Sequence, residues 1–330
     1  MSPRARVTSI AAAAAVLAAV GTVGLAVLSA DERGGGDAQR PQPRAGVPPL
    51  VLALGVRDDP EARALRRAER LYDLKRRVAA GRIFARYHSP EAVVGAAFSA
   101  WPDSSLARLE RLAQKRRDDP LVLLHLGYAR LWAGRDEDAL AAWREAMQAD
   151  PDSPSAQRAD DVLHPRFPSG QPFFVPSFAP PPGLARLSPP RQLTTLARRA
   201  RSRDVEAKLL YGLALQRLGH RLSALRQYEE AARLAPRNPE AQVAAAVGLF
   251  DKSRPAQAFS RLGPLVRRFP QAPTVRFHLG LLLLWLARVQ PGAVGEAKRQ
   301  LRLAYAEGPS SILGKEAQTL LDRLEGVRTG

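Results

Sequence analysis

The sequence contains no cysteine, and that absence excludes several kinds of chemistry. A chain without thiols forms no disulfide, offers no thiolate to a metal ion, has no cysteine nucleophile and carries no lipid on an N-terminal cysteine. Asparagine is almost absent as well. The single one, Asn238, precedes Pro239, and a proline at that place prevents N-glycosylation.

Acidic residues are too few to balance the basic ones. The chain has 50 Lys and Arg residues against 32 Asp and Glu, which gives a formal charge of +18 and a pI near 11.2. Such an excess favours an anionic partner: nucleic acid, an acidic polymer, phospholipid headgroups or an acidic protein. An arginine-rich genome would give the same bias without any such partner, so both interpretations stay open.

The sequence also lacks the motifs of catalytic and metal sites. No histidine stands in an H-E-x-x-H motif or shares a helix face with an acidic residue at ligand spacing. There is no nucleophile elbow, no P-loop and no dinucleotide-binding turn. We therefore predict no enzyme, no metal and no cofactor, and expect each histidine to be hydrogen-bonded or solvated. The five histidines are His88, His125, His164, His220 and His278.

One long uncharged run lies at the amino end. Residues 7–30 carry no charge and follow Arg4 and Arg6. The run matches the ~20 residues that span a bilayer and exceeds the ~7–15 residues of a signal-peptide apolar region. It predicts a signal anchor or transmembrane helix at residues 1–30, with a cytoplasmic N-terminus and a body outside the cytoplasm. For a body placed there, nucleic acid is not an expected partner.

A cleaved signal peptide is the alternative to this anchor. Ser29 and Ala30 are small residues that suit a cleavage site, and cleavage there would release a secreted protein. Leu28 is a poor residue two positions before such a cut, so we favour the uncleaved, single-pass anchor in the cell membrane.

The remainder of the chain has the pattern of helices. Residues 31–59 are rich in Gly, Pro and charge and predict a flexible spacer. From Asp59 onward apolar residues recur every three and four positions, as in Leu65, Ala68 and Tyr72, which is the period of one helix face. No useful length alternates with the period of two that strands require. The chain is predicted to be all-α.

Small residues and prolines recur at fixed spacing. Pro151 follows Ala139 by 12 residues, and Pro236 follows Ala224 by the same 12. Another alanine and another proline stand 34 positions beyond the second pair. A packing requirement repeats along a chain in this way, whereas an active site does not, so the pattern indicates stacked units.

A 34-residue unit of this kind resembles the tetratricopeptide repeat. The resemblance covers about residues 120–309 and includes a glycine before the alanine and an aromatic after it, at Gly127 and Trp143 and again at Gly212 and Tyr228. It implies an α-solenoid, a superhelix of antiparallel helix pairs in which the glycine admits the second helix, the aromatic fills the gap to the next unit and the proline ends the unit.

The predicted organisation follows from these patterns. Residues 154–204 are expected to supply a middle unit, with a helix on each side of a Pro/Phe-rich insertion near residues 164–187. The insertion is either a loop pinned to the array by its phenylalanines or a lid or partner-binding arm. The other predicted segments are an N-terminal helical region with a degenerate repeat (60–119), the repeats (120–309) and a C-terminal capping helix (310–330).

The resemblance also implies a binding surface. In this family the first helices of successive units line a concave groove, and the corresponding positions here are mostly apolar, unlike the lysine and asparagine that clamp a terminal carboxylate. Such a groove suits a hydrophobic peptide or an amphipathic helix, unless the side chains only join neighbouring units. The predicted groove residues are Leu124, Tyr128, Trp132, Arg217, Phe250, Phe277 and Trp285.

The sequence therefore predicts a membrane-anchored, non-catalytic scaffold of the cell envelope that binds a protein or peptide partner. The alternative is a basic adaptor that contacts anionic envelope polymer or lipid headgroups. Residues 61–87 carry nine Lys or Arg against three acids, and residues 198–203 read RRARSR. These residues either contact such a partner or form solvated helix faces.

Overall fold

A computed structural model describes residues 43–326, and the regular secondary structure of this part of the chain is helical. No strand occurs between these residues, which confirms the all-α prediction. None of the helices in this range is long and apolar enough to cross a membrane. The predicted anchor at residues 1–30 lies outside the described residues, as does the first part of the predicted spacer.

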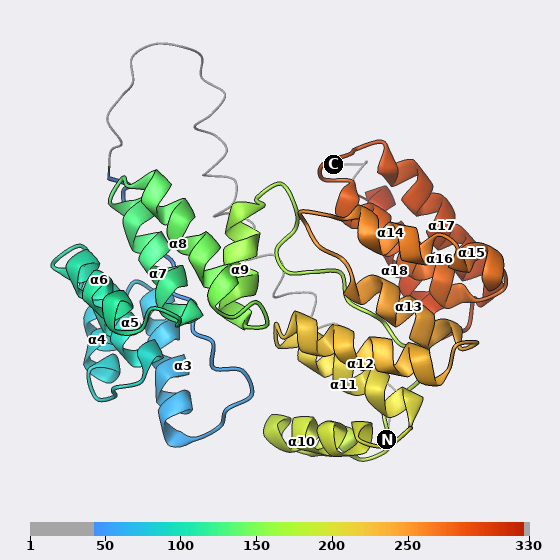
Figure 1. The fold of residues 1–330 in the computed structure, drawn as a ribbon, viewed down its shortest axis with the longest axis horizontal. Coiled ribbons are helices and arrows are strands. Elements are labelled where there is room, and N and C mark those ends of the chain that lie inside the picture. The colour runs from blue at the N-terminus through green and yellow to red at the C-terminus, as the bar shows by residue number, and fades with distance from the viewer. Residues whose placement is uncertain (1–42, 327–330) are drawn as a thin grey trace, which may run out of the picture.

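The helices form two groups that lie side by side, blue to green and yellow to red in Figure 1. We call them the first and second half-arrays. The first comprises α3 (Pro60–Asp73), α4 (Arg77–Phe84), α5 (Pro90–Ser99), α6 (Ser105–Lys115), α7 (Pro120–Trp132), α8 (Asp136–Ala149) and α9 (Pro154–Leu163). The second comprises α10 (Pro189–Ala200), α11 (Val205–Arg217), α12 (Arg221–Leu234), α13 (Pro239–Gly248), α14 (Ala256–Leu262), α15 (Leu265–Arg268), α16 (Pro273–Leu286), α17 (Ala293–Glu307) and α18 (Ile312–Gly326).

Apart from α10, which precedes the second half-array and packs on α11, both half-arrays have the same plan. Each contains three successive hairpins, in which a first helix packs on the next helix along the chain, and each ends in a single helix that covers the last hairpin. That closing helix is α9 in the first half-array and α18 in the second, where Leu313, Ala317 and Leu321 are buried. The capping helix predicted from the C-terminal sequence is therefore present.

The predicted middle unit is not a helix pair. Its two helices exist as α9 and α10, but α9 packs against α8 and α7, whereas α10 packs against α11. The sequence between them explains the separation, because a proline-rich segment interrupted by the short 3-10 helix Leu184–Arg186 cannot form the tight turn of a hairpin. The repeat array is thus divided at this segment.

The close contacts predicted for the repeat glycines are present. A Cβ on Gly127 would lie 2.3 Å from Nε1 of Trp143, and a Cβ on Gly212 would lie 2.5 Å from Cε1 of Tyr228. Each of these aromatics therefore packs first against the glycine of its own hairpin. Ala139 and Ala224 are buried in the same interfaces, which confirms the two predicted helix pairs.

Two helices that the sequence leaves continuous are interrupted. The pattern from Pro60 to Tyr87 divides into α3 and α4 at Lys75, whose φ of +62° is not compatible with a helix. The second helix of the unit that begins with α13 is split into α14 and α15 just before Leu265, at Gly263–Pro264, because a proline lacks the N–H that continues a helix.

The predicted flexible spacer is wrong from residue 43 onward. Leu50 and Leu54 belong to the core of the first half-array, so residues 44–54 are held on the helices. Glycine and proline content indicated flexibility, but the chain gains more by burying the apolar run between Val47 and Leu54 than it loses by ordering it.

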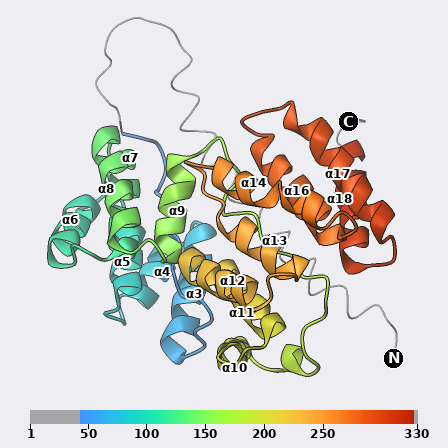
Figure 2. The ribbon, with the colours of Figure 1, turned by 45° about the vertical axis from the view of Figure 1, so that its right-hand side comes forward.

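Polar contacts join the two half-arrays. Lys252, just after α13, is fully buried and its ammonium pairs with Asp161 and, at 3.8 Å, with Asp160 of α9. The carboxylate of Asp152, just before α9, accepts hydrogen bonds from the backbone N–H groups of Leu222 and Ser223 in α12. Figure 2 shows α9 and α12 as neighbours where the two groups of helices meet.

Candidate peptide-binding grooves

The seven predicted groove residues differ in their access to solvent. Leu124, Tyr128, Phe250 and Phe277 are buried, whereas Trp132 and Trp285 are half-buried and Arg217 is exposed. Most of these side chains are therefore not available to a partner in this structure. Their role in binding stays a prediction.

Neighbouring aromatic rings account for part of this burial. Tyr128 lies edge-on to Trp143 at 5.6 Å between ring centroids, and Phe250 lies edge-on to Trp285 at 5.9 Å. Phe167, from the Pro/Phe-rich insertion, also meets the ring of Phe250 at 6.3 Å. These contacts between elements are worth about 0.5–1.5 kcal/mol each beyond the apolar area they bury.

The Pro/Phe-rich insertion covers the first helices of the second half-array. We call residues 170–178 the second strap. Its backbone bonds to three successive first helices: Phe174 N–H donates to Gln216 of α11, Val175 N–H to His278 of α16, and Ser177 N–H to Glu240 of α13. Phe174 of this segment is buried, and the strap lies along the helices on which the groove was predicted.

A corresponding segment covers the first half-array. We call residues 44–54 the first strap. Its Val51 N–H donates to His125 of α7 at 3.2 Å, and its Leu52 N–H donates to Glu69 of α3 at 2.8 Å. The strap begins near Trp132, whose ring lies under the Arg44 guanidinium at 6.0 Å.

The two straps are held in the same register. In the first strap the carbonyl of Pro48 accepts a hydrogen bond from the Tyr72 hydroxyl at 2.7 Å, and the N–H of Val51, three residues later, donates to His125. The residue between them that points into the helices is Leu50, which is buried.

The second strap repeats each of these contacts. The carbonyl of Pro172 accepts a hydrogen bond from the Gln216 amide at 2.9 Å, and the N–H of Val175, again three residues later, donates to His278 at 2.9 Å. The intervening buried residue is Phe174. Both half-arrays therefore hold an extended segment of the form Pro-x-apolar-Val.

The two histidines present the same atoms to the straps. Each is the sixth residue of its helix, α7 or α16, and each Nδ1 lies 2.7 Å from the carbonyl oxygen four residues earlier, that of Leu121 or Thr274. With the proton on Nδ1, the lone pair on Nε2 is free to accept a strap N–H. A second proton, on Nε2, would place an N–H donor against the N–H donor of the strap.

Burial keeps both imidazoles neutral. Burial of the side chain removes water from the ring and lowers the pKa of His125 to about 4, although the hydrogen bond to the Leu121 carbonyl acts to raise it. The same cause lowers the pKa of His278 to about 4. At neutral pH each ring is therefore a permanent hydrogen-bond acceptor in the groove.

The sequence analysis did not predict that His125 and His278 bind the straps, although the sequence contains a signal for it. The tripeptide His-Leu-Gly occurs at 125–127 and again at 278–280, at the same place in two units. Pro-x-x-Val occurs in both proline-rich segments, at 48–51 and 172–175. The two motifs are far apart in the sequence, so neither predicts the other without the fold.

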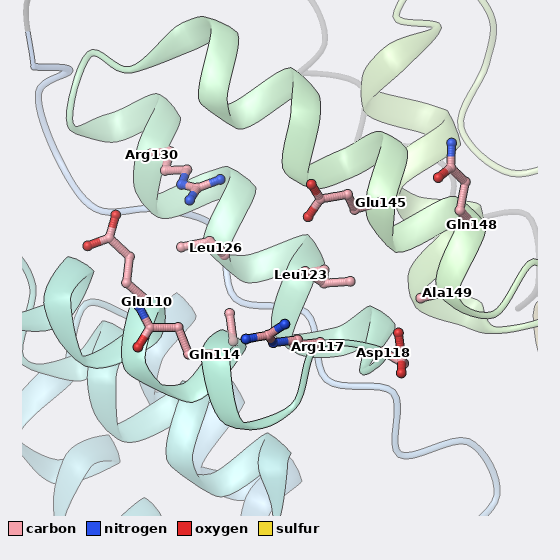
Figure 3. A pocket seen from close by; sticks show the side chains of 11 residues that line it. Glu110, Gln114, Arg117, Asp118, Leu123, Leu126, Arg130, Glu145, Gln148 and Ala149 are labelled. Atoms are coloured by element: carbon pink, nitrogen blue, oxygen red, sulfur yellow. The ribbon is translucent and has the colours of Figure 1, made fainter.

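An open cavity of about 750 Å³ lies elsewhere in the first half-array, among α6, α7 and α8. Leu126 and Arg130 line it from α7 (Figure 3), on a different face of this helix from His125 and Trp132. Its charges are mixed, since Glu110 and Glu145 face the same space as Arg117. Within residues 43–326 no three His, Asp or Glu side chains are grouped as metal ligands.

Comparison with known proteins yields similarity only among solved structures. No protein-family model matches the chain, and no curated protein matches it. The chain is similar to the C-terminal part of a TPR repeat-containing protein from Cytophaga hutchinsonii, with 13% identity, a TM-score of 0.29, and coverage of 77% of this chain and 98% of that one.

Two further structures show a comparable likeness. One is the Cut9–Hcn1 hetero-tetramer of APC/C, with 14% identity, a TM-score of 0.27, and coverage of 80% of this chain and 55% of that one. The other is yeast Tom70, with 11% identity, a TM-score of 0.31, and coverage of 85% of this chain and 67% of that one. None of the three adds a functional assignment to this chain.

Proposed function

We propose that this protein is a non-catalytic interaction scaffold of the cell envelope, which binds an extended segment of a partner protein along the first helices of its second half-array. One observation carries the proposal: the first helices of both half-arrays already hold an extended segment of the chain through its backbone.

The chemistry of the groove favours an extended segment over a helix. The backbone N–H and C=O groups of a helix bond to one another, whereas those of an extended chain are free to pair with side chains. Gln216, Glu240 and His278 present donors and acceptors from three different helices to such a backbone. A bound helix would leave these buried polar groups without partners.

The location is part of the same proposal. The uncharged run at residues 7–30, after Arg4 and Arg6, supports a single-pass anchor with the half-arrays outside the cytoplasm. Cleavage near Ala30 would instead secrete them. Alkaline washing of isolated membranes distinguishes the two, because an intact anchor stays in the membrane and a cleaved chain does not.

Photocrosslinking in intact cells tests the scaffold. A benzophenone amino acid is placed at Arg217, an exposed groove position next to Gln216, and in a matched variant at Arg233, an exposed arginine on α12. We expect one partner protein to be captured from position 217 and not from 233. Equal capture from both positions, or capture from neither, would contradict the proposal.

A basic adaptor for anionic lipid headgroups is the second candidate, and one surface favours it. At the turn between α3 and α4, Leu74 and Val78 are 66% and 72% exposed and flank Lys75 and Arg76. Apolar residues beside positive charge suit the surface of an anionic bilayer. The arginines of α10 are also exposed.

Salt separates the two candidates. Contacts of exposed arginines weaken as the Debye length shrinks from ~10 Å at 0.1 M salt to ~3 Å at 1 M, whereas apolar burial does not weaken in this way. Capture from position 217 is therefore expected to persist at high salt. Capture that disappears at high salt, together with binding of the protein to anionic vesicles that Leu74→Ser/Val78→Ser abolishes, would favour the adaptor.

A further inference from the structure

We propose that the groove of the second half-array recognises a partner segment of the form Pro-x-apolar-Val, and that the second strap is the chain's own copy of this motif, which the partner replaces. The inference rests on the proposed function and names the partner segment that the groove takes.

Two hydrogen bonds set the register of the bound segment. Gln216 donates to the carbonyl of Pro172, and His278 accepts the N–H of Val175. The same two contacts, also three residues apart, hold the first strap through Tyr72 and His125. Two segments that differ in sequence share this spacing, so the spacing belongs to the groove.

A pocket between the two bonds selects the apolar residue. The Phe174 side chain has 0% of its surface exposed. Its ring stacks on His278 at 5.3 Å with an interplanar angle of 16°, and it meets Tyr228 edge-on at 5.7 Å. In the first half-array the corresponding residue is Leu50, so we expect the motif to accept phenylalanine or leucine.

The second strap can leave the groove without unfolding a helix. It belongs to the connection between α9 and α10, and the residues that follow Phe178 are mostly exposed as far as α10. Once the strap leaves, Gln216 and His278 lose their partners inside an apolar surface, which is unfavourable for both. A partner segment whose apolar side chain fills the place of Phe174 brings its own carbonyl and N–H into the same register and restores both bonds.

The attached strap competes with any added peptide. A tethered segment has an effective concentration of about millimolar for short flexible connections, so the wild-type protein is expected to bind a free peptide weakly. Substitutions that loosen the strap should therefore strengthen binding of the peptide, which is the reverse of their effect on an ordinary binding site.

The test uses the full-length protein and a fluorescent peptide that copies residues 168–179. Phe174→Ala removes the strap's buried ring and leaves every groove residue unchanged. We expect it to raise the apparent affinity for the peptide by about tenfold or more. Loss of the buried ring weakens the packing of the strap in the groove, so the strap competes less well with the peptide. Phe173→Ala, which truncates the half-buried neighbour, is the matched control and should have a much smaller effect.

A second comparison tests the register. In one peptide the valine that corresponds to Val175 is N-methylated, so it has no N–H to donate. We expect it to bind the Phe174→Ala protein about tenfold more weakly than the parent peptide. When His278→Phe is added to that protein, parent and N-methylated peptides should bind equally, because the acceptor has gone.

Three outcomes would overturn the inference. The first is a folded Phe174→Ala protein that binds the peptide no better than wild type does. The second is a preference for the parent peptide that survives His278→Phe. The third is loss of folding, by helical circular dichroism, in both Phe174→Ala and Val175→Pro, a second variant that loosens the strap by removing the N–H bonded to His278; this would make the strap a fixed part of the core.

Failure here is distinguishable from failure of the proposed function. If the peptide does not bind but crosslinking from position 217 still captures a partner, the scaffold stands and the motif is wrong. If crosslinking captures nothing but the peptide still binds the groove of the second half-array, the strap is an internal ligand and the scaffold proposal fails.

Discussion

Glycines set how closely the paired helices approach. Gly127 and Gly212 each face a large aromatic ring of the second helix, at distances where no Cβ fits. Trp143 also donates from its indole Nε1 to the carbonyl of Leu124, next to this contact. The ring thus fills the space of the missing side chain and satisfies a buried carbonyl.

Gly127→Ala is expected to destabilise the protein. The added Cβ would lie 2.3 Å from Trp143 Nε1, so the helices must separate, at a cost of ~1–3 kcal/mol in the free energy of unfolding. The matched control is Gly295→Ala in α17, where a Cβ meets nothing within 4 Å and should stabilise the helix by about 0.5–1 kcal/mol. Urea denaturation measures both, and equal effects of the two variants would contradict this account.

The two groove histidines predict a loss of stability in weak acid. In the unfolded chain they bind a proton near the ordinary pKa of 6.5, but in the folded chain only near pH 4. Between these values the unfolded state binds more protons, so the free energy of unfolding falls as the pH falls, by ~3 kcal/mol for each histidine.

Comparison with His125→Gln/His278→Gln isolates this effect. Glutamine offers an acceptor to the strap N–H but does not titrate, so the variant should lose less stability between about pH 6.5 and about pH 4. Burial raises the pKa of Glu69 and Glu240, which acts in the opposite direction, but both proteins share these residues. Parallel pH profiles of the two proteins in urea denaturation would exclude the histidines as the cause.

At the scale of the element, a residue distant in sequence supplies the cap of α12. His220 precedes this helix and makes no side-chain capping bond. The carboxylate of Asp152 accepts the N–H groups of Leu222 and Ser223, the second and third residues of α12, at 2.7 and 3.0 Å. A negative charge at a helix N-terminus also matches the helix dipole.

Asp152→Ala should therefore lower the free energy of unfolding by about 1–2 kcal/mol, as the loss of an ordinary N-cap does. The matched control is Asp103→Ala, at an exposed aspartate whose carboxylate accepts no hydrogen bond from residues 43–326. Its effect should stay within ~0.5 kcal/mol. Thermal denaturation followed by circular dichroism compares them, and a shift of similar size in both would refute the role of the cap.

At the scale of the whole molecule, the half-arrays are joined by a buried ion pair. Lys252 is fully buried, and Asp161 is nearly so. The pair gives little net stability in such surroundings, but removing one member leaves the other charge buried without a partner. We therefore expect the ion pair to couple the folding of the two half-arrays.

Lys252→Ala should destabilise the protein by ~3–5 kcal/mol and separate the unfolding of the half-arrays. In a Trp285→Phe background the remaining tryptophans, Trp101, Trp132 and Trp143, all report on the first half-array. We expect urea transitions by fluorescence and by circular dichroism to coincide with Lys252 present and to differ without it.

The control for this experiment is Lys315→Ala, at an exposed lysine of α18. In this variant the urea transitions followed by fluorescence and by circular dichroism should still coincide. Coincident transitions in the Lys252→Ala protein as well would show that other contacts couple the half-arrays.

The sequence by itself determined the all-helical class and the pairing of α7 with α8 and of α11 with α12. The recurrence of Ala139 with Pro151, and of Ala224 with Pro236, reflects contacts between helices that are adjacent in the chain. Such contacts repeat with the period of the unit, so a single chain displays them. Six of the seven predicted groove residues lie on the first helices of their units, and Phe250 lies just after α13, but the burial of these side chains could not be read from that period.

Only the tertiary structure decided what occupies the grooves. Val51 and His125 are 74 residues apart, and Val175 and His278 are 103 apart, so no local pattern connects them. The straps have no periodicity, because an extended segment that bonds through its backbone needs few particular side chains. Proline and glycine content indicated a flexible spacer and a loop, whereas burial of Leu50 and Phe174 between the helices holds both segments in place.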